Sequence, residues 1–207
     1  MASTGRRNVQ AGPQGENRFA HGLTEIFAPA HFVIALPFVV GALTGGWYGL
    51  AWGALAASLC GGIPLAVIMA GVRSGRFGDK HISDRAQRPW LIGVIVALVV
   101  AALALLVVLG APDVMIACVA VMLATLAVTG PITFWWKISF HTAVATGSVV
   151  MLARLLPPAP VYAAGAVLVG AITWSRVTLK DHTPAQAAAG TLAGGTATWL
   201  VLATLLS

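Results

Sequence analysis

The side chains best suited to chemistry are concentrated in one short polar stretch, residues 175–186, between two long apolar segments. Charged residues make up only 9% of the chain, so the cluster of Arg176, Lys180, Asp181 and His182 is unusual. A guanidinium such as that of Arg176 can hold two phosphate oxygens through parallel hydrogen bonds. His182 follows five residues later, and a neutral imidazole can attack phosphorus. This stretch predicts chemistry on a phosphate ester or anhydride.

Two other polar segments carry residues of the same kind. Residues 80–89 include His81, Arg85 and Arg88, which would share one face of a helix at positions i, i+4 and i+7. In residues 137–141, Ser139 precedes His141 and is a suitable N-cap, a position that leaves backbone amides facing an anion. An ordinary polar loop at a membrane surface is the alternative interpretation of both segments.

The elements that must position these segments are apolar helices. The chain has 207 residues, is 58% hydrophobic and has a mean hydropathy of +0.89, which predicts a polytopic membrane protein. We expect an all-α transmembrane bundle of six to seven helices, formed by a single domain at residues 25–207 after a polar tail at 1–24. Hydropathy places the helices at residues 29–46, 47–72, 90–110, 113–129, 142–156, 161–174 and 185–206.

Glycine and proline predict where these helices bend, end or touch. Pro37 predicts a kink, Gly61-Gly62 with Pro64 an interruption, and Gly130-Pro131 the end of the fourth helix. The prolines at 157, 158 and 160 predict a tight turn. Gly41-x3-Gly45 and Gly190-x3-Gly194 predict close helix contacts.

The basic residues predict how the bundle is oriented. With seven crossings, eleven of the twelve Lys and Arg fall on the face of the N-terminus, and only Arg154 falls on the other. The positive-inside rule then places the three polar segments on the cytoplasmic face of a bacterial plasma membrane. Because the charge lies in short loops, the net +6 indicates lipid headgroups and phosphate rather than nucleic acid.

Over residues 73–195 the chain resembles the type 2 phosphatidic acid phosphatases (PAP2), a family of integral-membrane lipid phosphatases. Ser175, Arg176 and His182 match its third signature, Ser-Arg-x5-His, although Gln186 stands where the family has Asp. The second signature, Pro-Ser-Gly-His, is matched at Ser139 and His141 but not at Ile138 and Phe140. The first, Lys-x6-Arg-Pro, is matched by Arg88-Pro89, with His81 at the Lys position and Lys80 one residue away.

The resemblance implies a PAP2-like core and a role for each matched residue. His182 would attack phosphorus and form a phosphohistidine, while His141 would protonate the leaving oxygen and then activate water. Gln186 would orient His182 through its amide oxygen. The phosphate would be held by Arg88, Arg176 and Ser139, assisted by Lys80 or Arg85, with His81 at the Lys position. No metal or other cofactor is implied, because arginine donors can stabilise the phosphoryl charge.

The predicted function is metal-independent hydrolysis of a lipid phosphate or diphosphate, of prenyl, polyprenyl or phosphatidate type, drawn from the bilayer. The departures at His81, Ile138, Phe140 and Gln186 motivate an alternative, a PAP2-like membrane subunit that binds lipid phosphate with little or no hydrolysis. A transporter is less well supported, because ionisable groups are nearly absent from the helix interiors.

Overall fold

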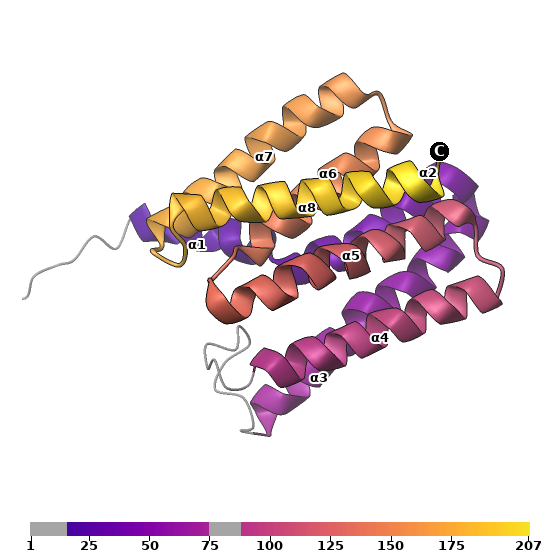
Figure 1. Ribbon diagram of the computed structural model, residues 1–207, viewed down its shortest axis with the longest axis horizontal. Helices are drawn as coiled ribbons and strands as arrows, with labels where there is room; N and C mark the ends of the chain where they lie inside the picture. The colour runs from indigo at the N-terminus through magenta and orange to yellow at the C-terminus, as the bar shows by residue number, and fades with distance from the viewer. Residues whose placement is uncertain (1–15, 75–87) are drawn as a thin grey trace, which may run out of the picture.

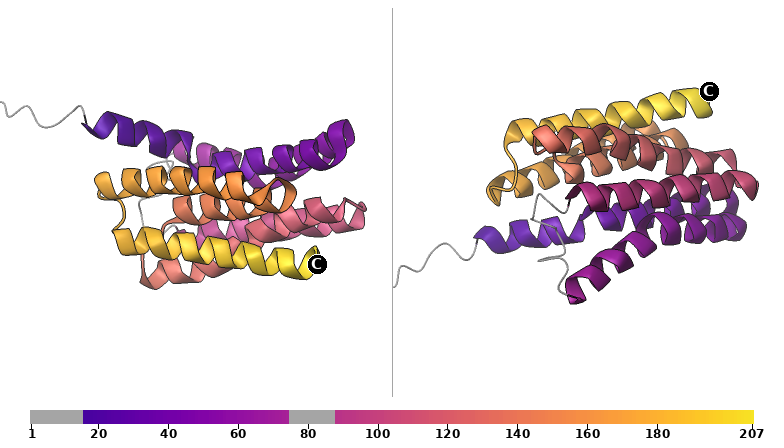
Figure 2. Two further views of the ribbon diagram at one scale, coloured as in Figure 1. Left: turned by 90° about the horizontal axis from the view of Figure 1, so that it is seen from above. Right: turned by 60° about the horizontal axis from the view of Figure 1, so that its bottom comes forward.

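The computed structural model describes residues 16–74 and 88–207, and this part of the chain forms helices and no strand. The helices pack side by side in a bundle, with α1 at one end (Figures 1 and 2). They are α1 (Glu16–Ile26), α2 (Pro29–Ala57), the π-helix η1 (Ser58–Gly62), α3 (Ile63–Arg73), α4 (Arg88–Val108), α5 (Asp113–Trp135), α6 (Phe140–Leu155), α7 (Pro158–Thr178) and α8 (Pro184–Leu205). The predicted all-helical bundle is confirmed.

Apolar helices of this bundle are suited to a bilayer. Within the described residues, four stretches are long and apolar enough to cross a membrane: Pro29–Gly71, Asp113–Trp135, Pro158–Thr178 and Pro184–Leu205. Ile92–Val108 and Phe140–Leu155 are shorter apolar helices. Large apolar side chains remain on the outside, including Val167, which is 75% exposed, and Leu192, which is 70% exposed. Such a surface is stable in hydrocarbon rather than in water, so this is an integral membrane protein.

Helix α2 consists of two legs that meet at Gly46, whose φ of 52° and ψ of −132° interrupt the helix. Glycine adopts this backbone readily, because it has no Cβ. A Cβ on Gly41 would meet the backbone of Gly49, and one on Gly53 would meet that of Pro37, so the legs run antiparallel in close contact. The two predicted helices, 29–46 and 47–72, are confirmed. The sharp break of α2 is at Gly46, its residue with non-helical angles, while Pro37 lies inside the first leg and the kink predicted there stays a prediction.

The predicted interruption near Gly61-Gly62 and Pro64 is a π-helix, η1. The Ile63 N–H donates to the carbonyl of Ser58, five residues earlier, which widens the turn. Pro64 follows directly after the π-helix, near the beginning of α3, and it has no backbone N–H to donate to the preceding turn. The wider turn lies beside the central cavity described below, whose wall includes Cys60, Gly61 and Pro64.

Two predictions about helix ends are wrong. α5 does not end at Gly130-Pro131 but continues to Trp135. Proline removes a single backbone bond, and in a membrane the backbone that follows has no water to bond with, so continuing the helix is favourable. α7 begins at Pro158 rather than at 161 and ends at Thr178 rather than at 174. Pro158 and Pro160 lie in its first turn, where proline is compatible with the helix.

The contact between α6 and α8 fixes two of the predicted site segments relative to each other. A Cβ on Gly190 would meet the carbonyl of Ser139, and one on Gly194 would meet that of Ala143, which confirms the close contact predicted for these glycines. The Thr142 hydroxyl donates to the carbonyl of Ala187 at 2.8 Å. The beginnings of α6 and α8 are therefore held backbone to backbone.

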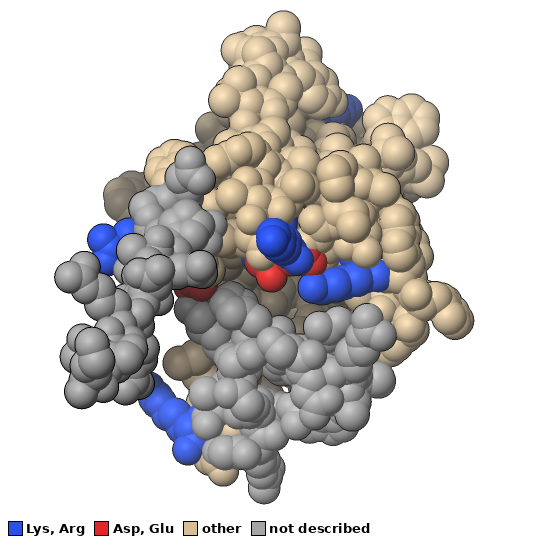
Figure 3. Space-filling model, turned by 90° about the vertical axis from the view of Figure 1, so that its left-hand side faces the viewer, with Lys and Arg blue, Asp and Glu red and all other residues tan. Residues whose placement is uncertain are grey.

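The α5–α6 and α7–α8 connections, the end of α3 and the beginning of α4 all lie at one end of the bundle, shown at the left in Figure 1. Basic and acidic side chains meet near the centre of this surface, which we call the polar end (Figure 3). Arg154 lies on α6 near the opposite end, where it donates to the Leu206 carbonyl after α8 at 2.7 Å. The arrangement agrees with the predicted segregation of charge.

Residues 16–24, assigned to a polar tail by the sequence analysis, form most of α1. This helix packs on α7 at the polar end, with the rings of Phe19 and Trp174 5.9 Å apart. Ala20 and Thr24 are buried on the same side, four residues apart. The helix escaped prediction because its apolar residues are too few for a membrane span and are interleaved with polar ones. Residues 1–15 lie outside the described residues.

Candidate functional site

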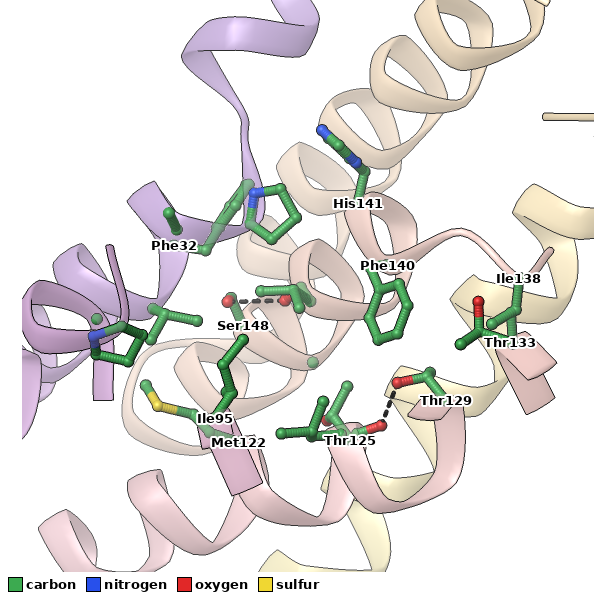
Figure 4. A pocket seen from close by; sticks show the side chains of 18 of the residues that line it. Phe32, Ile95, Met122, Thr125, Thr129, Thr133, Ile138, Phe140, His141 and Ser148 are labelled. Carbon is green, nitrogen blue, oxygen red and sulfur yellow. Dashed lines mark hydrogen bonds between the residues drawn. The ribbon is translucent and has the colours of Figure 1, made fainter. Parts of the chain in front are cut away.

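A cavity of about 620 Å³ extends from the polar end into the bundle. The α5–α6 and α7–α8 connections and the adjoining helix ends contribute Lys137, His141, Arg176, Asp181 and His182 to its wall, and α1 contributes His21, Thr24 and Glu25. Deeper in, the wall is apolar and includes Val33, Leu36, Ile95, Val99, Met122 and Val144. In Figure 4, His141 lies at one side of the pocket, with Ile95 and Met122 across from it. The cavity therefore joins a polar region, with three histidines, two cations and two carboxylates, to an apolar interior.

Hydroxyl groups deep in this cavity are bound to their own helices. Thr129 donates to the Thr125 carbonyl at 2.6 Å, and Ser148 donates to that of Val144 at 2.9 Å, as Figure 4 shows. A hydroxyl that donates its hydrogen bond to a helix carbonyl is less available to donate to a ligand. The interior is therefore suited to hydrocarbon, while the groups able to do chemistry lie near the polar end.

His182 lies in the tight turn between α7 and α8. Lys180 has a φ of 57°, and the N–H groups of Asp181 and His182 both donate to the Arg176 carbonyl, at 3.0 and 3.2 Å. The Nδ1 atom of His182 lies 3.1 Å from the carbonyl oxygen of Lys137. Because a carbonyl can only accept, Nδ1 carries the proton, and in the neutral ring Nε2 keeps its lone pair. This is the tautomer that a nucleophilic histidine requires.

The protonation of His182 is governed by its surroundings. Burial lowers the pKa of His182 below its ordinary value of 6.5, and the positive charges of Arg176 and Lys137 lower it further. Hydrogen bonds to the Lys137 carbonyl and to Gln186 act in the opposite direction but do not reverse the lowering. The neutral imidazole is therefore the prevailing form at pH 7.

Arg176 is held by two contacts at one of its terminal nitrogens. Its Nη1 lies 3.1 Å from Oδ2 of Asp181 and donates to the Thr24 hydroxyl at 3.4 Å. The Arg176 side chain is 12% exposed, whereas that of Asp181 is 41% exposed. Asp181 reaches back to Arg176 because residues 179–183 form a turn rather than a continuation of the helix.

The two predicted residues of the α5–α6 connection have different positions. His141 lies in the first turn of α6, is nearly buried and lines the cavity. Ser139 is fully buried, is not among the cavity-lining residues and accepts a hydrogen bond from the Thr142 N–H at 3.4 Å. The predicted N-cap is confirmed, and the Ser139 hydroxyl is engaged in capping α6.

Gln186 belongs to the capping box of α8. Its Oε1 accepts from the Thr183 N–H at 3.0 Å, while its own N–H donates to the Thr183 hydroxyl at 3.3 Å. Its hydrogen bond to His182 raises the pKa of that residue, but the Nδ1 atom of His182 lies against the Lys137 carbonyl. The orienting role expected of Gln186 thus falls mainly to a backbone carbonyl.

The other predicted site residues belong to the α3–α4 segment. Lys80, His81 and Arg85 lie outside the described residues, and Arg88 begins α4 at the polar end without a described side chain. Sequence reasoning assigned no role to Lys137 or Asp181 and missed α1 with His21, Thr24 and Glu25. The proximity of Lys137 to His141 in the sequence was a usable signal, as was the i, i+4, i+7 spacing of Phe19, Leu23 and Ile26 in α1.

Fold and site together define an all-helical integral membrane protein with a histidine-bearing cavity, lined by both cations and carboxylates, at one end of the bundle. Comparison with known proteins finds no matching family model, no similar curated protein and no similar solved structure.

Proposed function

We propose that this protein is a membrane lipid phosphatase that hydrolyses a lipid phosphate or diphosphate through a phosphohistidine. The observation that carries the proposal is that one cavity joins His141, His182 and Arg176 to an apolar interior. Pockets of this size and polarity take amphiphilic ligands of moderate size. A phosphate headgroup suits the polar end, and an acyl or prenyl chain suits the interior, so both parts of one lipid are accommodated.

The proposed reaction proceeds in two steps. Nε2 of His182 attacks phosphorus, the bond from phosphorus to the lipid oxygen breaks, and His141 gives that oxygen a proton. His141 then takes a proton from water, whose oxygen attacks the phosphohistidine and displaces His182 with release of phosphate. Arg176 and Lys137 would stabilise the negative charge on the phosphoryl oxygens. We place the polar end at the cytoplasmic face, as the basic residues predict.

A second function has specific support. The Ser139 hydroxyl is engaged in a helix cap, and the Gln186 side chain in a capping box. In the family that the sequence resembles, the side chains at these two positions contact the phosphate and the nucleophile instead. A protein of this kind could hold a lipid phosphate without hydrolysing it. Binding of orthovanadate without turnover would favour this second function.

Phosphate release from a prenyl diphosphate and from a phosphatidate tests the proposal, with the purified protein in detergent and EDTA present. We expect wild-type release to survive EDTA and to vanish in His182→Ala. His31→Ala is the matched control, because His31 also bonds a backbone carbonyl, that of Ile26 at 2.9 Å, but does not line the cavity. Equal losses in the two variants, or no release from either lipid, would refute the proposal.

A further inference from the structure

A continuous set of hydrogen bonds connects α1 to Arg176. The Ser175 hydroxyl donates to the Ala20 carbonyl at 2.8 Å, the hydroxyls of Thr24 and Ser175 lie 2.6 Å apart, and Arg176 Nη1 donates to Thr24 at 3.4 Å. Ser175 has one proton, which the Ala20 carbonyl receives, so Thr24 is the donor to Ser175. The hydrogen bonds therefore run in one direction: Arg176 donates to Thr24, Thr24 donates to Ser175, and Ser175 donates to the Ala20 carbonyl.

Simple apolar docking does not account for this arrangement. Ser175 and Ala20 are fully buried and Thr24 nearly so, and a buried hydroxyl costs stability unless it is hydrogen-bonded. Phe19 and Trp174 already provide an apolar contact between the same two helices. The chain of hydroxyls adds a defined register and ends on the charged group of the cavity.

The contacts of Arg176 leave one particular edge of its guanidinium without a partner among the described residues. Thr24 and Asp181 both contact Nη1. Nε is buried and, among the described residues, has no hydrogen-bond partner. The N–H bonds of Nε and Nη2 point in parallel, and this edge matches two oxygens of a phosphate.

We propose that α1 is part of the binding site, and that Thr24 and Ser175, together with Asp181, hold Nη1 of Arg176 so that its Nε–Nη2 edge receives a phosphoryl group. Thr24 and Ser175 are then positioning residues that act through Arg176. The identity of the anion rests on the proposed function, whereas the positioning itself does not require turnover. Residues that sequence reasoning placed in a tail thereby set the affinity of the site.

Binding of inorganic phosphate to the purified full chain, measured by isothermal titration calorimetry, is the direct test. We expect Thr24→Val to weaken binding about five- to tenfold, the usual net contribution of one hydrogen bond. Thr24→Ser, which keeps the hydroxyl, should bind within about twofold of wild type. Thr204→Val is the matched control, because the Thr204 hydroxyl bonds only carbonyls of α8, those of Leu200 and Val201.

A double-mutant cycle with Arg176→Lys shows whether Thr24 acts through Arg176. A lysine has no Nε–Nη2 edge, so Thr24→Val should cause no further loss in the Arg176→Lys background. The same loss in both backgrounds would overturn the inference, as would unchanged binding in Thr24→Val. If Thr24→Val is poorly folded, Ser175→Ala interrupts the same chain from α7, and it too should weaken phosphate binding.

The binding test separates this inference from the proposed phosphatase activity. One outcome would support the inference and refute the proposed phosphatase activity. In it, the wild-type protein binds phosphate, Thr24→Val binds it more weakly, and neither protein releases phosphate from lipids. Hydrolysis of a lipid phosphate by the wild-type protein, with an unchanged KM in Thr24→Val, would support the phosphatase activity and refute the inference about Thr24. For an active enzyme we expect the KM of Thr24→Val to rise more than its kcat falls.

Discussion

The α7–α8 and α5–α6 connections both join apolar helices at the polar end, and each supplies one histidine to the cavity, but they hold it differently. His182 lies in an irregular turn, and its ring is oriented by a carbonyl from the other connection, at Lys137. His141 lies inside the first turn of α6, where the helix backbone sets its direction. The difference shows that the side chain of a turn residue needs a partner from elsewhere in the fold to fix its orientation. The direction of a side chain in a helix is set by the helix itself.

Removing each histidine should give the largest effects and should distinguish the two connections. We expect His182→Ala to lose at least about 10³-fold in kcat, as when a nucleophile is removed. His141→Ala should lose about 10²- to 10³-fold as the proton donor. The His141→Ala loss should shrink with p-nitrophenyl phosphate, whose leaving group needs no proton, while that of His182→Ala should not. Equal sensitivity of both variants to the leaving group would contradict the assigned roles.

The second prediction concerns the helix contact that holds the two connections together. Gly190→Ala would place a Cβ against the Ser139 carbonyl and the Thr142 hydroxyl, so we expect a loss of about 1–3 kcal/mol in the free energy of unfolding. Gly170→Ala is the control, because a Cβ on that residue of α7 meets nothing within 4 Å. Gly170→Ala should leave the free energy of unfolding unchanged or raise it by up to about 1 kcal/mol. Unfolding in detergent, followed by circular dichroism, measures both, and equal stabilities would contradict the contact.

The third prediction uses the pH dependence of His182. Because its pKa is lowered, the neutral nucleophile should persist below pH 6.5, and the acid limb of kcat/KM should have its midpoint below that value. Lys137→Met removes one of the charges that lower this pKa, so the midpoint should move upward toward 6.5. Arg154→Met, which removes a charge near the opposite end of the bundle, should leave it unchanged. A midpoint above 6.5 in wild type would contradict the proposed environment.

The same shift predicts how stability depends on pH. With a folded pKa below the unfolded value, the unfolded state binds more protons between the two, so stability rises with pH in that window. The contribution of His182 to the free energy of unfolding is complete above about pH 6.5 and is lost as the pH falls toward the pKa of His182 in the folded protein. This slope should be smaller in His182→Ala, as thermal unfolding over a pH series would show.

The smallest expected effect concerns the Ser139 cap. Ser139→Ala should lower the free energy of unfolding by about 1 kcal/mol, the usual cost of removing an N-cap. Thr183→Ala, which removes the cap of α8 beside His182, should cost a similar amount and serves for comparison. A tenfold increase in KM with Ser139→Ala but not with Thr183→Ala would show instead that the Ser139 hydroxyl contacts the phosphate.

Much of the fold could be predicted from local features. Long apolar runs predicted the spanning helices, and the predicted boundary between the first two coincides with Gly46, whose backbone angles are readily adopted only by glycine. The end at Gly130-Pro131 was predicted wrongly, because in a bilayer the need of every backbone group for a partner outweighs the local preference of proline. Helix α1 could not be found by hydropathy, since its stability comes from packing on α7.

The candidate site divides in the same way. The residue types and spacing of Arg176, His141 and His182 identified the cations and imidazoles, because such groups are rare in an apolar chain and suit phosphate. The sequence could not show that the Lys137 carbonyl orients His182, since any residue has a carbonyl and only the fold decides which one lies 3.1 Å away. Nor could it show that the Ser139 hydroxyl is engaged in a cap.

The sequence by itself determined that this is a helical membrane protein whose charge gathers at one end, because hydropathy and charge are properties of residues and need no partners. Only the tertiary structure decided that the two connections share one cavity, that α1 forms part of its wall and that Thr24 contacts Arg176. These are contacts between segments as much as 150 residues apart, such as Thr24 and Ser175, whose separation is 151. No local pattern encodes such contacts, because packing of the whole bundle brings them about.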